Sequence, residues 1–347
     1  MSKYWLKLIA NCILIIFAFC CIIYNQLIIY GISQGKGQLS IVLNAKPIEN
    51  ILLDPSLPDS LKNKLNLISE IRNYTVDSIA FKPSKNYTTF YNQLNKPILY
   101  TISAAEPFKL KAKEWKFPFL GTVSYKGFFN KEKAKREILK LVSEDYDIDV
   151  YSPSGWSTLG WFKDPVLSSM LKKTPGSLAN IIIHELMHGT LYVKNNVTFN
   201  ENLANFIGDK GAEKFLLFKY GINSKEYIDY IEDKADNKIY TEYILNSIPL
   251  LDSLYNSFTS NHTYHFKKEQ KKNIITKIVL GVNRLPLHKK NGYFRYTLQA
   301  FKEGNAFFMS FSRYDSQYNF FEKEYTEKYA SNLRNYVLHL KTTYSSL

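Results

Sequence analysis

A five-residue motif, His184-Glu185-Leu186-Met187-His188, constrains this chain more than any other part of it. Residues four apart stand on one face of a helix, so the two histidines can direct ring nitrogens to a single metal ion. Glu185 lies beside the first histidine, close enough to take a proton from a water held by that ion. The surrounding apolar residues predict a buried helix with Ser177 as its N-cap. The alternative interpretation is a core helix that carries two ordinary histidines.

The third ligand of such a site is expected on the next helical segment. That segment is predicted from Asn200 to Lys210, ending at Gly211. Glu201 would bring a carboxylate to the metal and leave one position open for water. Glu201 also completes a capping box with Thr198, in which its side chain only closes the helix end. The spacing alone does not decide between these two roles.

The stretch from His184 to Ala204 reads HELMHGTLYVKNNVTFNENLA. It resembles the bacterial putative aminopeptidase family, whose pattern is close to HELxHxxLYVKxDTxFNExFA. This resemblance implies a zinc metallopeptidase of the gluzincin type with HExxH and FNE motifs. It also implies that one Zn²⁺ is bound by His184, His188 and Glu201, and that Glu185 is the catalytic base. We expect Asn200 to orient Glu201 or a histidine through a hydrogen bond.

Two further segments resemble the same family. Ser157 to Pro165 matches its STLGWFxDP pattern, and we expect Leu159, Gly160 and Trp161 to pair with the substrate backbone. The alternative for this segment is a packed loop with Trp161 in the core. The segment from Gly304 to Tyr314 resembles the pattern NNAHLASVATYHD. Tyr314 is therefore our candidate for stabilising the oxyanion.

Charge and cysteine content exclude several classes of function. The formal net charge is +14, but the lysines are scattered along the chain, so no nucleic-acid partner is expected. The cysteines Cys12, Cys20 and Cys21 all lie in the first hydrophobic segment. The rest of the chain therefore has no disulfide, no catalytic cysteine and no cysteine metal ligand.

The N-terminus predicts a membrane anchor, assigned to residues 1–33. An apolar run from Leu8 to Ile32 is long enough to span a bilayer, and Lys3 and Lys7 precede it. We therefore expect the membrane to be a partner through residues 8–32, with the catalytic domain outside the cytoplasm, in the bacterial periplasm or cell envelope. A cleaved signal peptide or a lipoprotein are the alternatives.

The remaining residues, 34–347, are predicted to form one zinc metallopeptidase domain with an α+β, zincin-like fold. In this prediction residues 34–175 form an α+β part with a small sheet before the metal helix, and residues 176–347 form a mostly helical part. The periodicity predicts helices at 48–73, 131–144, 212–220, 225–257, 267–280 and 319–340, and strands at 97–103, 119–125 and 146–151.

These observations favour a membrane-anchored, zinc-dependent peptidase that acts on peptides or proteins, with an aminopeptidase specificity implied by the resemblance alone. Two alternatives stay open. A zinc endopeptidase would use the same site, and a non-catalytic, membrane-tethered binding protein would use the motif only for packing. The sequence does not indicate an oligomeric state.

Overall fold

The computed structural model describes residues 11–12, 24–117, 121–153, 155, 163–194, 196–314 and 317–344, with the side chains of residues 313 and 314 left out. The chain divides into two compact units, Met1–Asn44 and Ala45–Leu347. We call them the N-terminal unit and the main unit, and each is described by itself.

The described helix of the N-terminal unit is α2 (Asn25–Asn44). Its apolar stretch from Leu27 to Ile32 is followed by Ser33-Gln34-Gly35-Lys36-Gly37-Gln38, which interrupts the hydrophobic character of the helix. Among the described residues, no helix combines the length and the apolar character that a bilayer crossing needs. The predicted transmembrane helix, and the membrane-anchored localisation outside the cytoplasm that depended on it, are corrected by this finding. Within the predicted span, residues 8–10 and 13–23 lie outside the described residues.

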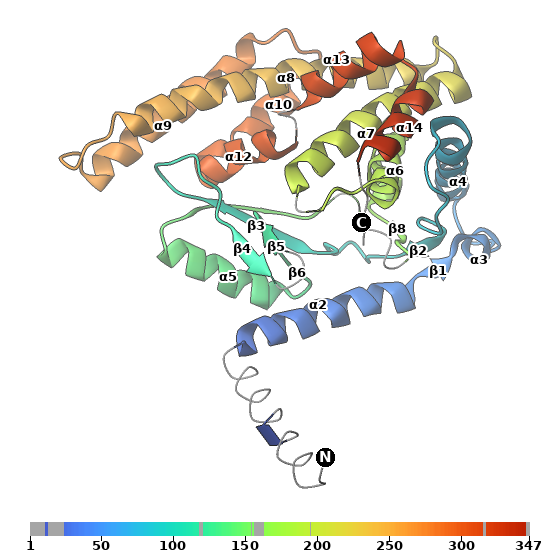
Figure 1. Ribbon diagram of the computed structural model, residues 1–347, viewed down its shortest axis with the longest axis horizontal. Helices are drawn as coiled ribbons and strands as arrows, with labels where there is room; N and C mark the ends of the chain where they lie inside the picture. Colours follow the sequence, from blue (N-terminus) through green and yellow to red (C-terminus); the bar gives the residue numbers. More distant parts are fainter. Residues whose placement is uncertain are drawn as a thin grey trace, which may run out of the picture. The chain divides into compact units, whose positions relative to one another are not determined.

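The main unit is mostly helical (Figure 1). Its helices are α3 (Ile48–Leu52), α4 (Asp59–Ile79), α5 (Lys131–Ser143), α6 (Pro175–Thr190), α7 (Val197–Tyr220), α8 (Lys225–Asn256), α9 (Tyr264–Gly281), α10 (Lys290–Thr297), α11 (Ala300–Glu303), α12 (Asn305–Tyr314), α13 (Tyr318–Tyr329) and α14 (Leu333–Thr343). The predicted α+β fold class is therefore also corrected, to a mostly helical fold with small sheets. The reason is that the strands are short and all of them precede residue 168.

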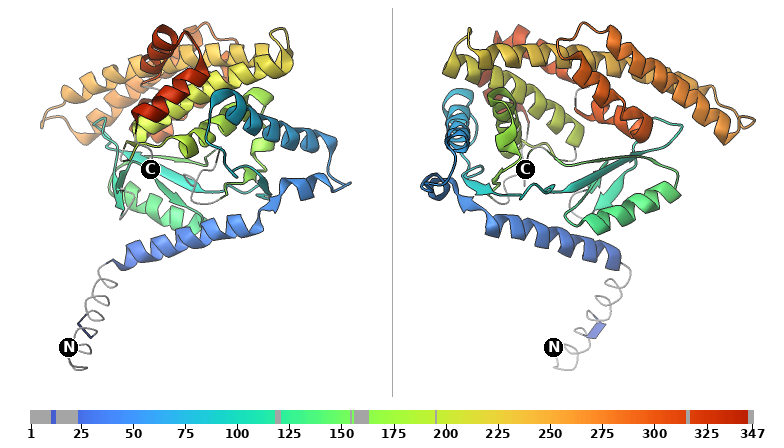
Figure 2. Two further views of the ribbon diagram at one scale, coloured as in Figure 1. Left: turned by 45° about the vertical axis from the view of Figure 1, so that its right-hand side comes forward. Right: turned by 180° about the vertical axis from the view of Figure 1, so that it is seen from behind.

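The described strands form three small sheets. They are β1 (Lys46–Pro47), β2 (Thr89–Tyr91), β3 (Tyr100–Ala105), β4 (Trp115–Phe117), β5 (Gly121–Val123), β6 (Lys126–Phe128), β7 (Asp147–Tyr151) and β8 (Val166–Leu167). The sheet orders are β1-β2-β8, β6-β3-β7 and β4-β5. All pairs are antiparallel except β2 with β8. Helices α5 and α12 cover opposite sides of the β6-β3-β7 sheet (Figures 1 and 2).

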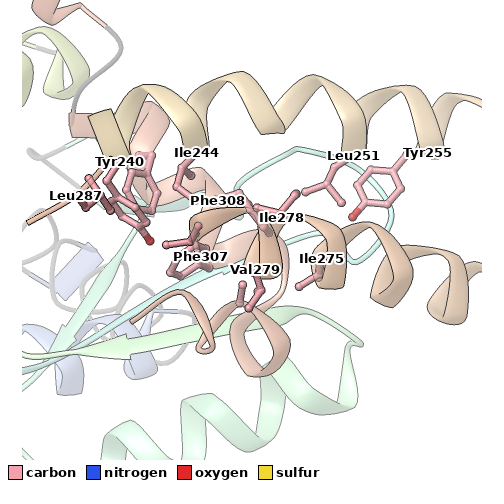
Figure 3. Close-up of a cluster of buried hydrophobic side chains, with 13 residues drawn as sticks. Tyr240, Ile244, Leu251, Tyr255, Ile275, Ile278, Val279, Leu287, Phe307 and Phe308 are labelled. Carbon is pink, nitrogen blue, oxygen red and sulfur yellow. The ribbon is translucent and has the colours of Figure 1, made fainter. Parts of the chain in front are cut away.

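A cluster of buried apolar side chains joins α8, α9 and α12 (Figure 3). Isoleucines and phenylalanines such as Ile244, Ile278 and Phe308 are at most 1% exposed. Burying one such side chain contributes about 1.5–3 kcal/mol to folding. This cluster therefore supplies much of the stability of the C-terminal helices.

A buried polar network ties these helices to the sheet. The ammonium group of Lys271 on α9 forms an ion pair with Asp147 on β7 and donates a hydrogen bond to the carbonyl oxygen of Pro107 at 2.8 Å. The backbone N–H of Asn305 donates to the same carboxylate of Asp147 at 2.6 Å. The hydroxyl group of Tyr255 donates to the side-chain oxygen of Asn305 at 2.7 Å. Because four elements meet here, this network fixes the helical layer against β7.

Candidate metal centre

The two histidines lie on α6, which begins one turn earlier than its apolar stripe alone indicates. The N-cap is Thr174, whose hydroxyl group accepts a hydrogen bond from the backbone N–H of Ser177, and Pro175 occupies the first turn. The predicted N-cap, Ser177, is thus inside the helix. Leu178, Ile182 and other apolar residues on one face are fully buried and fix α6 in the core.

The third residue, Glu201, lies on α7, which is much longer than the predicted segment from Asn200 to Lys210. Its N-cap is Asn196, whose side chain accepts from the backbone N–H of Phe199. The helix continues through Gly211, where an added Cβ atom would lie 2.9 Å from Cγ2 of Ile183 on α6. Gly211 therefore allows two helices to approach closely and does not end one. The prediction of a helix end at this glycine was wrong.

His184, His188 and Glu201 converge at one point, with their possible ligand atoms all within 4.8 Å of one another. The Nε2 atoms of the two histidines are 3.2 Å apart. Oε2 of Glu201 lies 3.5 Å from Nε2 of His184, and Oε1 lies 3.7 Å from Nε2 of His188. The capping-box alternative placed Glu201 against its own helix end, whereas the cap is supplied by Asn196.

These distances fit a cation with tetrahedral coordination. Ligand atoms bound at about 2.0–2.2 Å in a tetrahedron lie about 3.3–3.6 Å from one another. Two imidazole nitrogens and one carboxylate are also a donor set that divalent transition metals accept, with a fourth position left open. His184, His188 and Glu201 could therefore hold a metal ion.

The electrostatics of Glu201 agree with this arrangement. Burial acts to raise the pKa of the Glu201 carboxyl group, but the hydrogen bonds and charges of His184 and His188 outweigh burial and lower it. Its side chain is 15% exposed. Glu201 is thus an ionised carboxylate in a nearly closed site. The ionised form is the one that a metal ligand requires.

The imidazole ring of His188 contacts an aromatic side chain in addition to the other two residues of the cluster. Its Nδ1 atom is buried and has no hydrogen-bond partner among the described residues. The ring instead packs against Tyr192, with ring centroids 5.9 Å apart. Burial raises the pKa of the Tyr192 hydroxyl group, the charge of Glu201 adds to this shift, and a hydrogen bond with Asn200 opposes it. We did not identify Tyr192 from the sequence, although its position four residues after His188 was an available signal.

Glu185 lies next to the cluster without being part of it. Burial raises the pKa of its carboxyl group to about 7; His184 opposes this shift, while the carboxylates of Glu201 and Asp164 add to it. A carboxylate with a pKa near neutrality is suited to accept a proton and to return it. The carboxylate group also lies directly against Gly155.

Asn200 makes different contacts from those predicted. Its side chain accepts a hydrogen bond from the backbone N–H of Val193 and donates one to the carbonyl oxygen of Val193, both at 2.8 Å. It thereby ties Val193, in the connection between the two ligand helices, to α7. These two hydrogen bonds go to the connection and not to His184, His188 or Glu201.

Four other predicted site residues lie outside the described part of the chain, either entirely or by their side chains. Leu159, Gly160 and Trp161 lie outside the described residues. Tyr314 ends α12, and its side chain is also outside them. Three residues after Tyr314 the chain contacts α7, the helix that carries Glu201, because the side-chain oxygen of Asn202 accepts a hydrogen bond from the backbone N–H of Gln317 at 2.8 Å.

Comparison with known proteins gives one result that covers most of the chain. The family described as "Putative aminopeptidase" matches residues 29–343. A search of curated proteins gave no match, and a search of solved structures gave none. The family match includes α6, α7 and all three converging side chains. The chain therefore belongs to the putative aminopeptidase family.

Proposed function

We propose that this protein is a zinc-dependent aminopeptidase of the gluzincin type, in which the HExxH and FNE motifs supply the active site. The observation that carries the proposal is the convergence of His184, His188 and Glu201, with Glu185 beside them. Family membership supports a peptidase activity. The preference for zinc rests on the donor set of two imidazoles and one carboxylate.

The roles of the individual residues follow from this proposal. His184, His188 and Glu201 hold the ion, and Zn²⁺, when bound, lowers the pKa of a water molecule and polarises the scissile carbonyl group. Glu185 accepts the proton from the attacking water and passes it to the leaving amine. In this scheme Glu185 is a catalytic residue and not a ligand.

Three further assignments complete the proposal. Asn200 holds the connection between the ligand helices, as its two hydrogen bonds to Val193 indicate. Tyr314 stabilises the oxyanion, which is supported by the return of the following chain to Asn202. Leu159, Gly160 and Trp161 bind the backbone of the peptide substrate, an assignment that rests on the family pattern.

Hydrolysis should require both a metal ion and a free substrate amine. An aminopeptidase must recognise the terminal ammonium group, so an N-acetylated peptide should be cleaved about 100-fold more slowly than the same peptide with a free amine. Removing the metal with a chelator should abolish cleavage, and added zinc should restore it. Rates can be measured on the full chain by following peptide loss with chromatography. Equal rates on free and blocked peptides would indicate an endopeptidase instead, and cleavage that survives complete metal removal would contradict the proposal as a whole.

A further inference from the structure

We infer that two glycines, Gly155 and Gly208, are positioning residues with separate tasks in this site. Gly208 sets the spacing between the ligand helices and thereby the affinity for the metal. Gly155 sets the orientation of the Glu185 carboxylate and thereby the turnover number. The inference rests on the proposed function. Neither glycine is one of the proposed ligands or the proposed base.

Gly208 lies where α7 crosses α6 beside the first histidine. A Cβ atom added to Gly208 would lie 3.1 Å from the carbonyl oxygen of Asn180 and 3.3 Å from Cβ of His184. Both contacts are tighter than ordinary van der Waals packing, and the atoms they meet belong to the core of α6. These atoms cannot turn aside as the end of a side chain can. A methyl group at Gly208 would therefore push α6 away from α7.

Such a shift acts directly on the ligand set, because His184 is on α6 and Glu201 is on α7. Metal sites tolerate deviations of only about 0.2 Å in ligand distance. A displacement of a few tenths of an ångström is comparable with this tolerance. We therefore expect Gly208→Ala to weaken zinc binding about 10- to 100-fold, as changes around metal ligands commonly do.

Gly155 acts on Glu185 and not on the ligands. A Cβ atom added to Gly155 would lie 2.8 Å from both Cγ and Cδ of Glu185, and closer still to its Oε1. The atoms that it meets are the flexible end of a side chain, so the fold can absorb the substitution by turning that carboxylate away. The consequence is a misplaced base in an intact fold. Misplacing a reacting group by about 1 Å can cost about 100-fold in rate.

Gly189 provides the matched control. It is also on α6, next to His188, but a Cβ atom added there would meet no atom of the described residues within 4 Å. Gly189→Ala should therefore leave zinc affinity and turnover within about twofold of the wild type. The contrast among the three glycines separates crowding at a defined atom from the general effect of placing alanine near the site.

The decisive measurement is a double-mutant cycle of Gly155→Ala and Glu185→Gln on the full chain. Gly155→Ala alone should lower kcat about 100-fold, with little change in KM, zinc affinity or unfolding temperature. If Gly155 acts through Glu185, then Glu185→Gln should cost far less in the Gly155→Ala background than in the wild type. A merely structural role for Gly155 would not produce this coupling. If the kcat loss of the double variant equals the product of the losses in the two single variants, the assignment of Gly155 is overturned.

The assignment of Gly208 is tested by zinc competition with a chromophoric chelator and by the visible absorption of the cobalt-substituted protein. The expected result is weaker binding and an altered cobalt spectrum in Gly208→Ala, with a metal-free protein that still folds. Wild-type zinc affinity, or a metal-free Gly208→Ala protein that fails to fold, would overturn it. These failures differ from failure of the proposed function, which would appear as wild-type turnover in Glu185→Gln alone.

Discussion

Replacing Glu185 by glutamine should reduce kcat about 1000-fold while zinc stays bound. Glutamine has nearly the shape of glutamate, but its amide cannot accept the proton of the attacking water. Zinc content should remain unchanged because Glu185 is not among the three converging residues. The measurement is a comparison of kcat and of bound zinc in the variant and the wild type.

A suitable control is Glu242→Gln, which makes the same chemical change at an exposed position of α8. Its turnover should stay close to that of the wild type. Wild-type turnover in Glu185→Gln would contradict the role of Glu185 as the base. Loss of zinc together with activity would show instead that this carboxylate helps to hold the metal.

Replacing Lys271 by methionine should lower the free energy of unfolding by about 3–5 kcal/mol. Burial lowers the pKa of Lys271 and raises the pKa of Asp147, although each charge partly offsets the shift of the other. Without the ammonium group, Asp147 is left as a buried carboxylate that keeps the hydrogen bond from the backbone N–H of Asn305. The carbonyl oxygen of Pro107 also loses the shorter of its two hydrogen bonds and keeps the one from the side-chain amide of Asn305 at 3.3 Å. Chemical denaturation of the metal-free variant and wild type measures the difference.

The matched control is Lys225→Met, which removes one partner of an exposed ion pair. The side chains of Lys225 and Asp229 are 82% and 45% exposed, against 9% and 19% for Lys271 and Asp147. Water screens an exposed ion pair of this kind, so Lys225→Met should change stability little. Equal effects of the two substitutions would mean that the network at Lys271 does not join the helices to the sheet. Adding Asp147→Asn to Lys271→Met should recover part of the loss, because the unpaired charge is then removed.

Local patterns predicted several elements well. The helix predicted at 131–144 corresponds to α5, and the helix predicted at 225–257 corresponds to α8. The strand predicted at 146–151 corresponds to β7. The apolar spacing is strong in α5, and the helix caps Asn130 and Ser224 lie where their side chains can accept a backbone hydrogen bond. Periodicity and capping act within a few residues, so a single sequence contains this information.

Breaks within elements were predicted less well. The single helix expected at 48–73 is divided into α3 and α4, because Pro55 and Pro58 cannot continue a helix. The single helix expected at 319–340 is divided into α13 and α14 at Ala330 and Ser331, which both have positive φ angles. Such φ angles are unusual for residues other than glycine, so the sequence around Ala330 and Ser331 did not predict the end of a helix.

The candidate site was predicted in part. The positions of His184, His188 and Glu201 in the motif were sufficient to propose a common cation. The sequence could not distinguish Glu201 as a ligand from Glu201 as a capping residue, because both roles have the same spacing. The contacts of Gly155 and Gly208 were also hidden, because each depends on how distant segments pack together. At the N-terminus, the helix α2 continues beyond the predicted span into a polar stretch, and no described helix has the length and apolar character of a bilayer span.

The zinc content of the purified full chain tests the central claim most directly. After dialysis against metal-free buffer, elemental analysis of the wild type should find about one zinc ion per chain. The Glu201→Ala variant, which keeps the helix cap at Asn196 but lacks the carboxylate, should retain almost none. A wild type that binds no zinc, or a Glu201→Ala variant that binds it as tightly as the wild type, would contradict the account.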